Sequence, residues 1–180
     1  MKKIIFTLLL TMFASVVVYS QAGIYLFLPT ITSGAGAAGV HADESLISST
    51  SYGSAVTITL SVGGNPGVSQ PNFSDVSVTK NFDKSSLRLQ NLLVRGTQSP
   101  FAEIRFYNTQ DVLLYSVRLE GVYVGTQAAS ASDGCPNGCQ SISESYSLVP
   151  TSKVIQTNFA ETPNQVLTYD IKQNKTTFTQ

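Results

Sequence analysis

The only histidine of the sequence, His41, is the first residue to consider for catalysis. A catalytic triad would need a nucleophile and an orienting acid near it. Serine is so abundant here that its presence carries no information, and no Gly-x-Ser-x-Gly turn occurs. His41 stands beside a glycine- and alanine-rich segment, residues 33–39. We therefore expect His41 to be solvated or locally hydrogen-bonded, and we expect His41→Ala to leave the fold unchanged.

Metal binding and acid–base chemistry have little support among the carboxylates. Zinc generally takes three or four ligands from Cys, His and carboxylates, whereas residues 41–44, His-Ala-Asp-Glu, form a lone cluster without a matching partner. Glycoside cleavage needs a pair of carboxylates, and the sequence leaves this alternative open. We expect no metal, no cofactor and no enzymatic activity. The acids on or beside expected strands, which we interpret as outward-facing charges, are Glu103, Asp111, Glu120 and Glu144.

The two cysteines, Cys135 and Cys139, flank Pro-Asn-Gly in a segment rich in turn-forming residues. The N-terminus has the features of an export signal, so the chain should meet an oxidising compartment, and we expect these cysteines to form a disulfide. The ring is small, so it should stabilise the fold by less than the roughly 3 kcal/mol that chain entropy gives for a loop of about 15 residues. A redox Cys-x-x-Cys motif would have one residue fewer, which argues against thiol catalysis.

The first twenty residues have the features of a secretory signal peptide. Lys2 and Lys3 provide a positive start, an apolar run follows, and residues 18–20 form a plausible cleavage site that ends at Ser20. Cleavage after Ala22, with Ser20 and Ala22 at the small-residue positions, is the alternative. The apolar run is shorter than the about 20 residues that span a bilayer, so an uncleaved anchor is the weaker hypothesis. We expect residues 21–180 to form a single domain that is periplasmic or secreted, with no stable membrane insertion.

The composition excludes nucleic-acid binding. Charged residues make up 12% of the chain, against about 25% in an average soluble domain. The chain has 11 basic and 11 acidic residues, and loss of Lys2 and Lys3 leaves a formal charge of −2. Nucleic-acid binding depends on clustered Lys and Arg that neutralise phosphates, and the sequence contains no such cluster.

Alternation of apolar and polar residues with period two predicts an all-β fold. Several of the expected strands are long enough to bend or to contain a bulge. They are Ile24 to Ile31, Ser54 to Val62, Phe73 to Phe82, Phe101 to Asn108, Val112 to Gly125, Ser141 to Phe159 and Gln165 to Lys172. Clusters of turn-forming residues that we interpret as loops include residues 33–39, 63–67, 97–100, 108–111 and 128–138.

Helical periodicity occurs once, over about Ser85 to Arg95. Asp83 is the candidate N-terminal cap, and Gly96 can adopt the left-handed conformation that ends a helix. Apolar residues occupy two opposite faces of this helix, which suggests two neighbours: the protein's own sheet and a second subunit. The alternative is that a short helix end exposes one leucine. Leu89, Leu92 and Leu93 form the first face, and Leu87 and Val94 the second, a possible subunit interface.

Several segments, taken in order, resemble the Hcp family of bacterial type VI secretion. The most specific runs from Pro71 to Ser86 and resembles that family's strand leading into Asp-Lys-Ser-Ser and its single helix. His41, followed twelve residues later by Gly53 of Ser-Tyr-Gly, matches the family's spacing between a histidine loop and a Ser-aromatic-Gly step. Further similar segments are residues 22–26, 102–106, 116–122, 143–148 and 168–172.

The resemblance implies a β-barrel of two packed antiparallel sheets with one short flanking α-helix. It also implies self-association into rings, typically hexamers, whose stacked copies form a tube, with secretion-apparatus or effector proteins as further partners. The export signal departs from the pattern, because tube subunits assemble in the cytoplasm. The tryptophans usual in the family are also absent: Tyr52 and Tyr169 replace two, and Glu44 stands at a third. A monomeric exported binding or effector domain that uses its loop tips is therefore the alternative function.

Overall fold

Strands dominate the computed structural model, which describes residues 22–36, 41–59, 67–69, 71–132 and 141–180. The two long strands are β9 (Leu113–Ser132) and β10 (Ser141–Asn158). The helix is α2 (Ser86–Arg95). The other strands are β1 (Gly23–Phe27), β2 (Ser45–Ser51), β3 (Ser54–Ala55), β4 (Ile58–Thr59), β5 (Gly67–Val68), β6 (Asn72–Phe73), β7 (Val76–Asn81), β8 (Ser99–Tyr107), β11 (Gln165–Asp170) and β12 (Lys175–Thr179).

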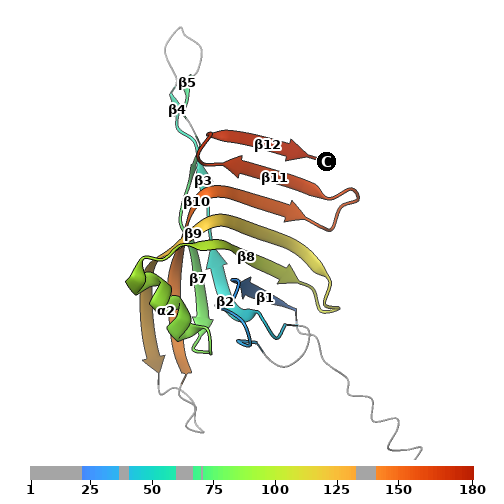
Figure 1. Cartoon of the computed structure of the whole chain (residues 1–180). Helices are drawn as coiled ribbons and strands as arrows, with labels where there is room; N and C mark the ends of the chain where they lie inside the picture. The colour runs from blue at the N-terminus through green and yellow to red at the C-terminus, as the bar shows by residue number, and fades with distance from the viewer. Residues whose placement is uncertain (1–21, 37–40, 60–66, 70, 133–140) are drawn as a thin grey trace, which may run out of the picture.

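One antiparallel sheet closes on itself to form a barrel. Its strand order is β12-β11-β10-β7-β2-β1-β8-β9, and β9 also pairs with β10, which closes the ring of strands from β10 to β9. Beyond the barrel, β11 and β12 extend the sheet from the second half of β10. In Figure 1, β8 to β12 lie one above the other and α2 flanks the barrel near one end of them. The predicted all-β barrel with one short flanking helix is confirmed.

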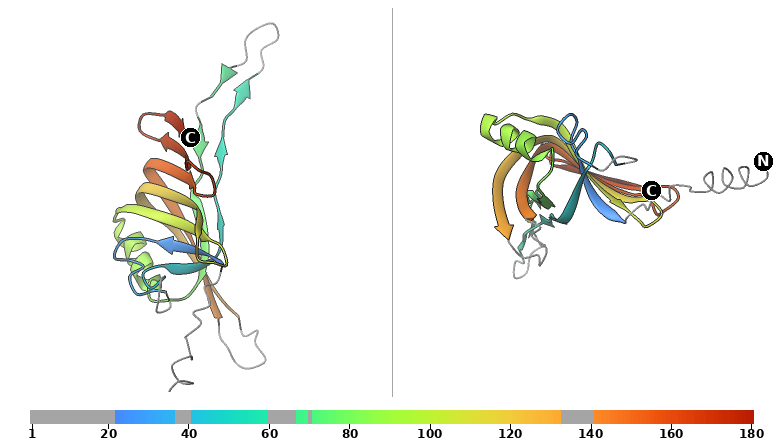
Figure 2. Two further views of the ribbon diagram at one scale, coloured as in Figure 1. Left: turned by 90° about the vertical axis from the view of Figure 1, so that its right-hand side faces the viewer. Right: turned by 90° about the horizontal axis from the view of Figure 1, so that it is seen from below.

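Two short ladders, β3 with β6 and β4 with β5, form an arm that projects from the barrel (Figure 2). At the base of this arm, the ring of Tyr169 stacks on Phe73 with centroids 4.6 Å apart. The Tyr169 hydroxyl also donates a hydrogen bond of 2.7 Å to the carbonyl of Pro71. An aromatic residue of β11 therefore fastens the arm to the extended part of the sheet.

The core lies inside the barrel and follows the period-two pattern of the sequence. Side chains at alternate positions of each strand are buried, because successive residues of a strand point to opposite faces. Each such side chain contributes about 1.5–3 kcal/mol by leaving water. Fully buried examples are Leu26, Val78, Ile104, Val117, Leu119 and Leu148.

Glycines allow the long strands to bend, as their length predicted. The register of β9 and β10 shifts between Ser147 and Leu148, opposite Gly125, and again between Pro150 and Lys153. Gly121 has φ +66°, and a Cβ there would lie 2.7 Å from the Thr151 hydroxyl oxygen. Such irregularities increase twist and turn a strand, so β9 and β10 can serve both the barrel and its extension.

Several predicted strand boundaries were wrong. The strand expected over Ile24 to Ile31 ends at Phe27, the one expected from Ser54 is interrupted between Ala55 and Ile58, and β8 begins inside the loop expected over residues 97–100.

Two strands of the main sheet were missed, and the end of another was mistaken for a loop. The β2 strand was missed because Ser45–Ser51 is mostly hydroxyl residues, although Ser45 and Ile47 are buried at alternate positions. The β12 strand was missed because all of its residues are exposed, so no apolar alternation marks it. Residues 128–132 were interpreted as a loop, but they continue β9 and pair with the start of β10.

The helix begins one residue later than predicted, and its cap differs. Ser85 is the N-cap residue, and it makes no side-chain cap hydrogen bond. Asp83 instead accepts hydrogen bonds from the Ser85 backbone N–H at 2.7 Å and from its hydroxyl at 2.6 Å. Gly96 ends the helix in the left-handed conformation with φ 58°, as predicted. Among the described residues, no helix is long and apolar enough to cross a membrane.

Candidate functional site

The two apolar faces of α2 have different surroundings. Leu89 is fully buried, and Leu92 and Leu93 pack partly buried against the core. Leu87 is 66% exposed and Val94 is 78% exposed. The structure therefore places the two predicted interface residues on the outer side of a helix that already covers the barrel with its other side.

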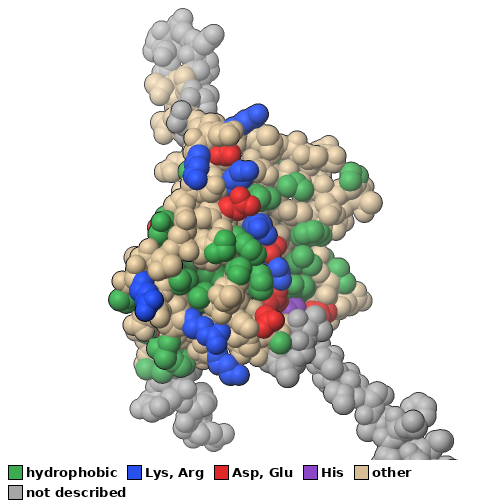
Figure 3. Space-filling view, in the orientation of Figure 1, with side chains coloured by type: hydrophobic (Ala, Val, Ile, Leu, Met, Phe, Trp, Pro, Cys, Tyr) green, Lys and Arg blue, Asp and Glu red, His purple; other side chains and the backbone are tan. Residues whose placement is uncertain are grey.

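A second exposed apolar pair lies at the loop that leads into α2. Phe82, just after β7, is 49% exposed, and Ile142 of β10 is 40% exposed. The Phe82 backbone N–H donates a 2.9 Å hydrogen bond to the Ile142 carbonyl, so the two residues are neighbours. In the space-filling view, hydrophobic side chains reach the surface in several places, over the middle of the strands and at the lower left beside α2 (Figure 3). Phe82 and Ile142 thus add to the apolar exposure beside the helix, while other exposed apolar side chains, among them Leu46, Val112 and Phe178, lie on other parts of the fold.

A buried ion cluster, which we call the Lys80 cluster, holds the start of α2 on the barrel. The ammonium group of Lys80 is fully buried and lies 2.9 Å from Asp83 and 3.4 Å from Glu144. It also donates hydrogen bonds of 2.9 Å to the Ser86 hydroxyl and the Asn81 carbonyl. Glu144 is 3% exposed, so its interpretation as an outward-facing charge was wrong.

Asp83 remains ionised within this cluster. Burial alone would raise the pKa of its carboxyl group, but hydrogen bonds from Ser45, Ser85 and Lys80 outweigh burial, and the pKa lies below its ordinary value. A carboxylate held in this way satisfies the backbone at the entry of the helix. The cluster is therefore an anchor that fixes where the exposed helix face points.

Arg88 attaches the helix at a second point. Its guanidinium donates hydrogen bonds to the carbonyls of Thr30, Ile31 and Ser33, in the turn after β1, at 3.2, 3.2 and 2.8 Å. An arginine engaged with three carbonyls does not fold back over the apolar side chain next to it. Leu87 accordingly stays accessible.

His41 lies in a separate cluster, between two carboxylates. Its Nδ1 is 2.5 Å from Glu44 and its Nε2 is 2.7 Å from Asp111, in the turn between β8 and β9. The imidazole stacks on the Tyr25 ring at a centroid distance of 4.0 Å and meets Tyr107 edge-on at 4.6 Å. Its side chain is 13% exposed. Of the two expected states, solvated or locally hydrogen-bonded, the structure shows the second, with Glu44 as the local partner and Asp111 as a distant one.

Arg105 continues this cluster along β8. Its guanidinium bonds Glu44 and Glu103 at 2.6 Å each. Burial alone would lower the pKa of Arg105, but these two carboxylates raise it. The Tyr107 hydroxyl also lies 3.3 Å from Glu44. Glu103 and Asp111, predicted to face outward, are therefore half-buried and paired, whereas Glu120 makes a 3.6 Å ion pair with Arg118 near the surface.

The ion pairs of these two clusters hold separate parts of the fold together. Among the described residues, no group of three or more His, Cys, Asp or Glu side chains is arranged to hold a metal ion.

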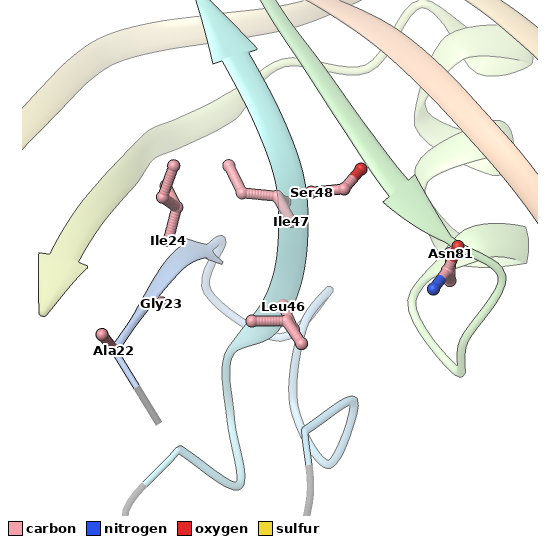
Figure 4. Close-up of a pocket in the computed structure, with 7 residues that line it drawn as sticks. All are labelled: Ala22, Gly23, Ile24, Leu46, Ile47, Ser48 and Asn81. Atoms are coloured by element: carbon pink, nitrogen blue, oxygen red, sulfur yellow. The ribbon is translucent and has the colours of Figure 1, made fainter. Parts of the chain in front are cut away.

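A depression of about 330 Å³ lies along β1, β2 and the end of β7, and no charged side chain lines it. In Figure 4, Leu46 lies near the start of β2, and Asn81, at the end of β7, lies apart from the other labelled residues. Two predicted features, the signal peptide and the Cys135–Cys139 disulfide, lie outside the described residues.

Sequence reasoning missed the two ionic clusters. The sequence contained a signal for the first cluster. Val76, Val78 and Lys80 occupy alternate positions of one strand, so Lys80 points inward like the two valines. The contact of His41 with Asp111 joins residues 70 positions apart. No local pattern marks such a pair.

Comparison with known proteins identifies relatives. The family model described as "Type VI secretion system effector, Hcp" matches residues 25–168. A type six secretion system protein of known structure has a TM-score of 0.73 and 15% identity, with 87% of this chain and 99% of that chain covered. None of the curated proteins matches this sequence.

Two further solved structures are similar. Hcp1 from Salmonella typhimurium has a TM-score of 0.71 and 17% identity, covering 88% of this chain and 100% of that one. Another Hcp protein has a TM-score of 0.67 and 21% identity over 84% of this chain and 99% of that chain. At these identities the structural likeness shows a shared fold.

Proposed function

This chain belongs to the Hcp family of type VI secretion system proteins, and we propose that it is an exported structural subunit that self-associates into hexameric rings able to stack into tubes. The family consists of structural tube proteins rather than enzymes. The ionic clusters of this chain agree with that role, because each fastens one part of the fold to another. Its partners would be copies of itself and, further, secretion-apparatus or effector proteins.

The observation that carries the proposal is the exposed apolar face of α2. A helix that covers a single barrel needs one apolar face, and Leu89 with its neighbours provides it. Leu87 and Val94 gain nothing from the barrel and leave apolar surface in water. The Lys80 cluster and Arg88 hold this face in a fixed direction. A rigid apolar patch fits a subunit interface, where a neighbouring copy would cover it.

Export is the part of the proposal that rests on the N-terminal residues. The positive start and apolar run of residues 1–20 fit a signal peptide cleaved after Ser20, so the mature subunit would be periplasmic or secreted. The sparse charge of the chain and its paired carboxylates leave a surface wetted mainly by hydroxyls and amides. The proposed rings would then assemble outside the cytoplasm.

Light scattering coupled to size-exclusion chromatography of the mature chain tests assembly. We expect a mass several-fold above that of the monomer. Leu87→Asp should abolish the oligomer and leave the melting temperature nearly unchanged, because the side chain is exposed in the monomer and its charge would be desolvated only in the interface. Leu114→Asp, at a 38% exposed leucine on β9, is the matched control and should keep the oligomer.

Three results would count against the proposal. A wild-type chain that stays monomeric at tens of micromolar would favour a monomeric exported binding domain. Unfolding of the Leu87→Asp variant would mean that Leu87 supports the fold rather than an interface. Equal loss of the oligomer in both variants would show that the helix face has no special part in assembly.

A further inference from the structure

The loop before β2 and the turn between β8 and β9 are joined through one imidazole. His41 belongs to the loop, and Asp111 belongs to the turn, where it has φ 64°. Within the turn, the Asp111 backbone N–H donates to the Asn108 carbonyl at 3.1 Å. The carboxylate of Asp111 is 2.7 Å from the His41 Nε2, and 70 residues separate the two. This contact is therefore a tertiary link between two surface segments.

We propose that His41 is an acid-closed clamp, which holds the loop before β2 on the β8–β9 turn when its imidazole is protonated and releases the turn when it is neutral. The clamp lies within one chain, so it does not depend on ring assembly and goes beyond the proposed function. Protonation would make this end of the barrel more rigid, and loss of the proton would loosen it.

The chemistry of the imidazole explains the two states. A protonated imidazole donates a hydrogen bond from each nitrogen, whereas the neutral ring donates one and presents a lone pair at the other nitrogen. In this cluster both nitrogens face carboxylate oxygens, of Glu44 and Asp111. Loss of the proton therefore turns one of the two contacts from attraction to repulsion.

The surroundings decide which contact breaks. Glu44 has a side chain 6% exposed and is also held by the Arg105 guanidinium at 2.6 Å and by the Tyr107 hydroxyl at 3.3 Å. The side chain of Asp111 is 20% exposed, and His41 is the side-chain partner found for it. The neutral ring keeps its contact with the fixed carboxylate, and Asp111, on an exposed turn, moves away.

The packed neighbours determine the direction of the pH response. Tyr25 of β1 and Tyr107 of β8 enclose the ring, Arg105 acts through Glu44, and Asp43 faces Ser33 and Gly34 instead. Burial lowers the pKa of His41, but the hydrogen bonds and charges of Glu44 and Asp111 outweigh it, and the pKa is raised above 6.5. The clamp is therefore closed below about pH 6.5 and opens as the pH rises through the raised value.

His41 is the only histidine of the sequence. If the mature chain carries no polyhistidine tag, the imidazole signals therefore come from His41 alone. Nuclear magnetic resonance of the imidazole from about pH 5 to about pH 9 should give a pKa above the ordinary value of about 6.5. Asp111→Asn removes one carboxylate and should lower the pKa. Asp75→Asn makes the same change at an exposed carboxylate outside the cluster and should leave it unchanged.

Hydrogen exchange measures the release of the turn itself. After correction for the intrinsic pH dependence of exchange, amides of residues 108–112 should be protected in acid and lose protection as His41 titrates. In His41→Gln, which cannot titrate, protection should be independent of pH. A pKa at or below the ordinary value, or an identical exchange profile in wild type and His41→Gln, would overturn the proposal.

Discussion

Replacing Lys80 by methionine would keep most of the side-chain volume and remove the positive charge of the Lys80 cluster. The methionine would fit among the same neighbours, since the lysine is fully buried on the inward side of β7. What it could not replace are the contacts of the ammonium with Asp83, Glu144 and the Ser86 hydroxyl. We expect Lys80→Met to destabilise the fold strongly.

The magnitude follows from what the lost charge leaves behind. Breaking a buried ion pair by removing one partner costs about 3–5 kcal/mol, because the other charge stays buried. Glu144, with a 4% exposed side chain, would keep two uncharged partners, the Gln127 amide nitrogen at 3.4 Å and the Tyr146 hydroxyl. Asp83 has a 20% exposed side chain and can recruit water, so the lower end, about 3 kcal/mol, applies. For a domain of this size that corresponds to a drop of about 6–12 °C in melting temperature.

Urea unfolding followed by far-ultraviolet circular dichroism and tyrosine fluorescence provides the measurement. The chain has eight tyrosines and no tryptophan, so the fluorescence reports on tyrosine alone. Each variant should be measured at two protein concentrations, because self-association adds to apparent stability in a concentration-dependent way.

A matched control and a rescue sharpen this prediction. Lys153→Met changes a half-exposed lysine that lies opposite Asp170 and Glu120, and it should cost less than about 1 kcal/mol. Adding Glu144→Gln to Lys80→Met removes the stranded charge and should recover part of the loss. If Lys80→Met is no more destabilising than Lys153→Met, the Lys80 cluster is not an anchor and the reasoning fails.

Two further predictions concern the core and the cysteines. Leu89→Ala empties a fully buried site and should cost about 2–5 kcal/mol in urea unfolding, whereas Leu92→Ala, at a partly buried site, should cost clearly less; equal losses would contradict the packing described. Titration of the denatured, unreduced mature protein should find no free thiol if Cys135 and Cys139 are bonded to each other, and Cys135→Ser should lower stability only modestly; two titratable thiols would refute the disulfide.

Much of the fold could be predicted from the sequence because its strands alternate and its helix has sharp ends. The alternation that buries Ile104 also turns its neighbours Glu103 and Arg105 to the opposite face of the strand, and Gly96 ends the helix as expected. The alternation of apolar and polar residues failed as a guide where the buried residues are polar. In β2, serine and threonine occupy most positions. The buried Ser45 donates a hydrogen bond to Asp83, just beyond the end of the neighbouring strand β7, and no apolar pattern marks it.

One part of the candidate site could likewise be predicted from the sequence, and another part could not. Exposure of Leu87 and Val94 follows from helical spacing, which is local and can be counted along the chain. The partners of His41 and Lys80 depend on how distant segments meet, because Asp111 and Glu144 approach only after the barrel closes. The sequence around a single histidine or lysine therefore does not show which distant carboxylates pair with it.

The order of the strands along the chain has a consequence for how the barrel forms. From β8 to β12, each strand pairs with the next in sequence, so this meander can form from local contacts. The pairs that close the barrel join β1 to β8 and β7 to β10, across long stretches of chain. Closing long loops has a high entropic cost and slows folding. Until those late pairings form, β1, β7 and the apolar interior are open to other chains, and this is the stage at which folding competes with aggregation.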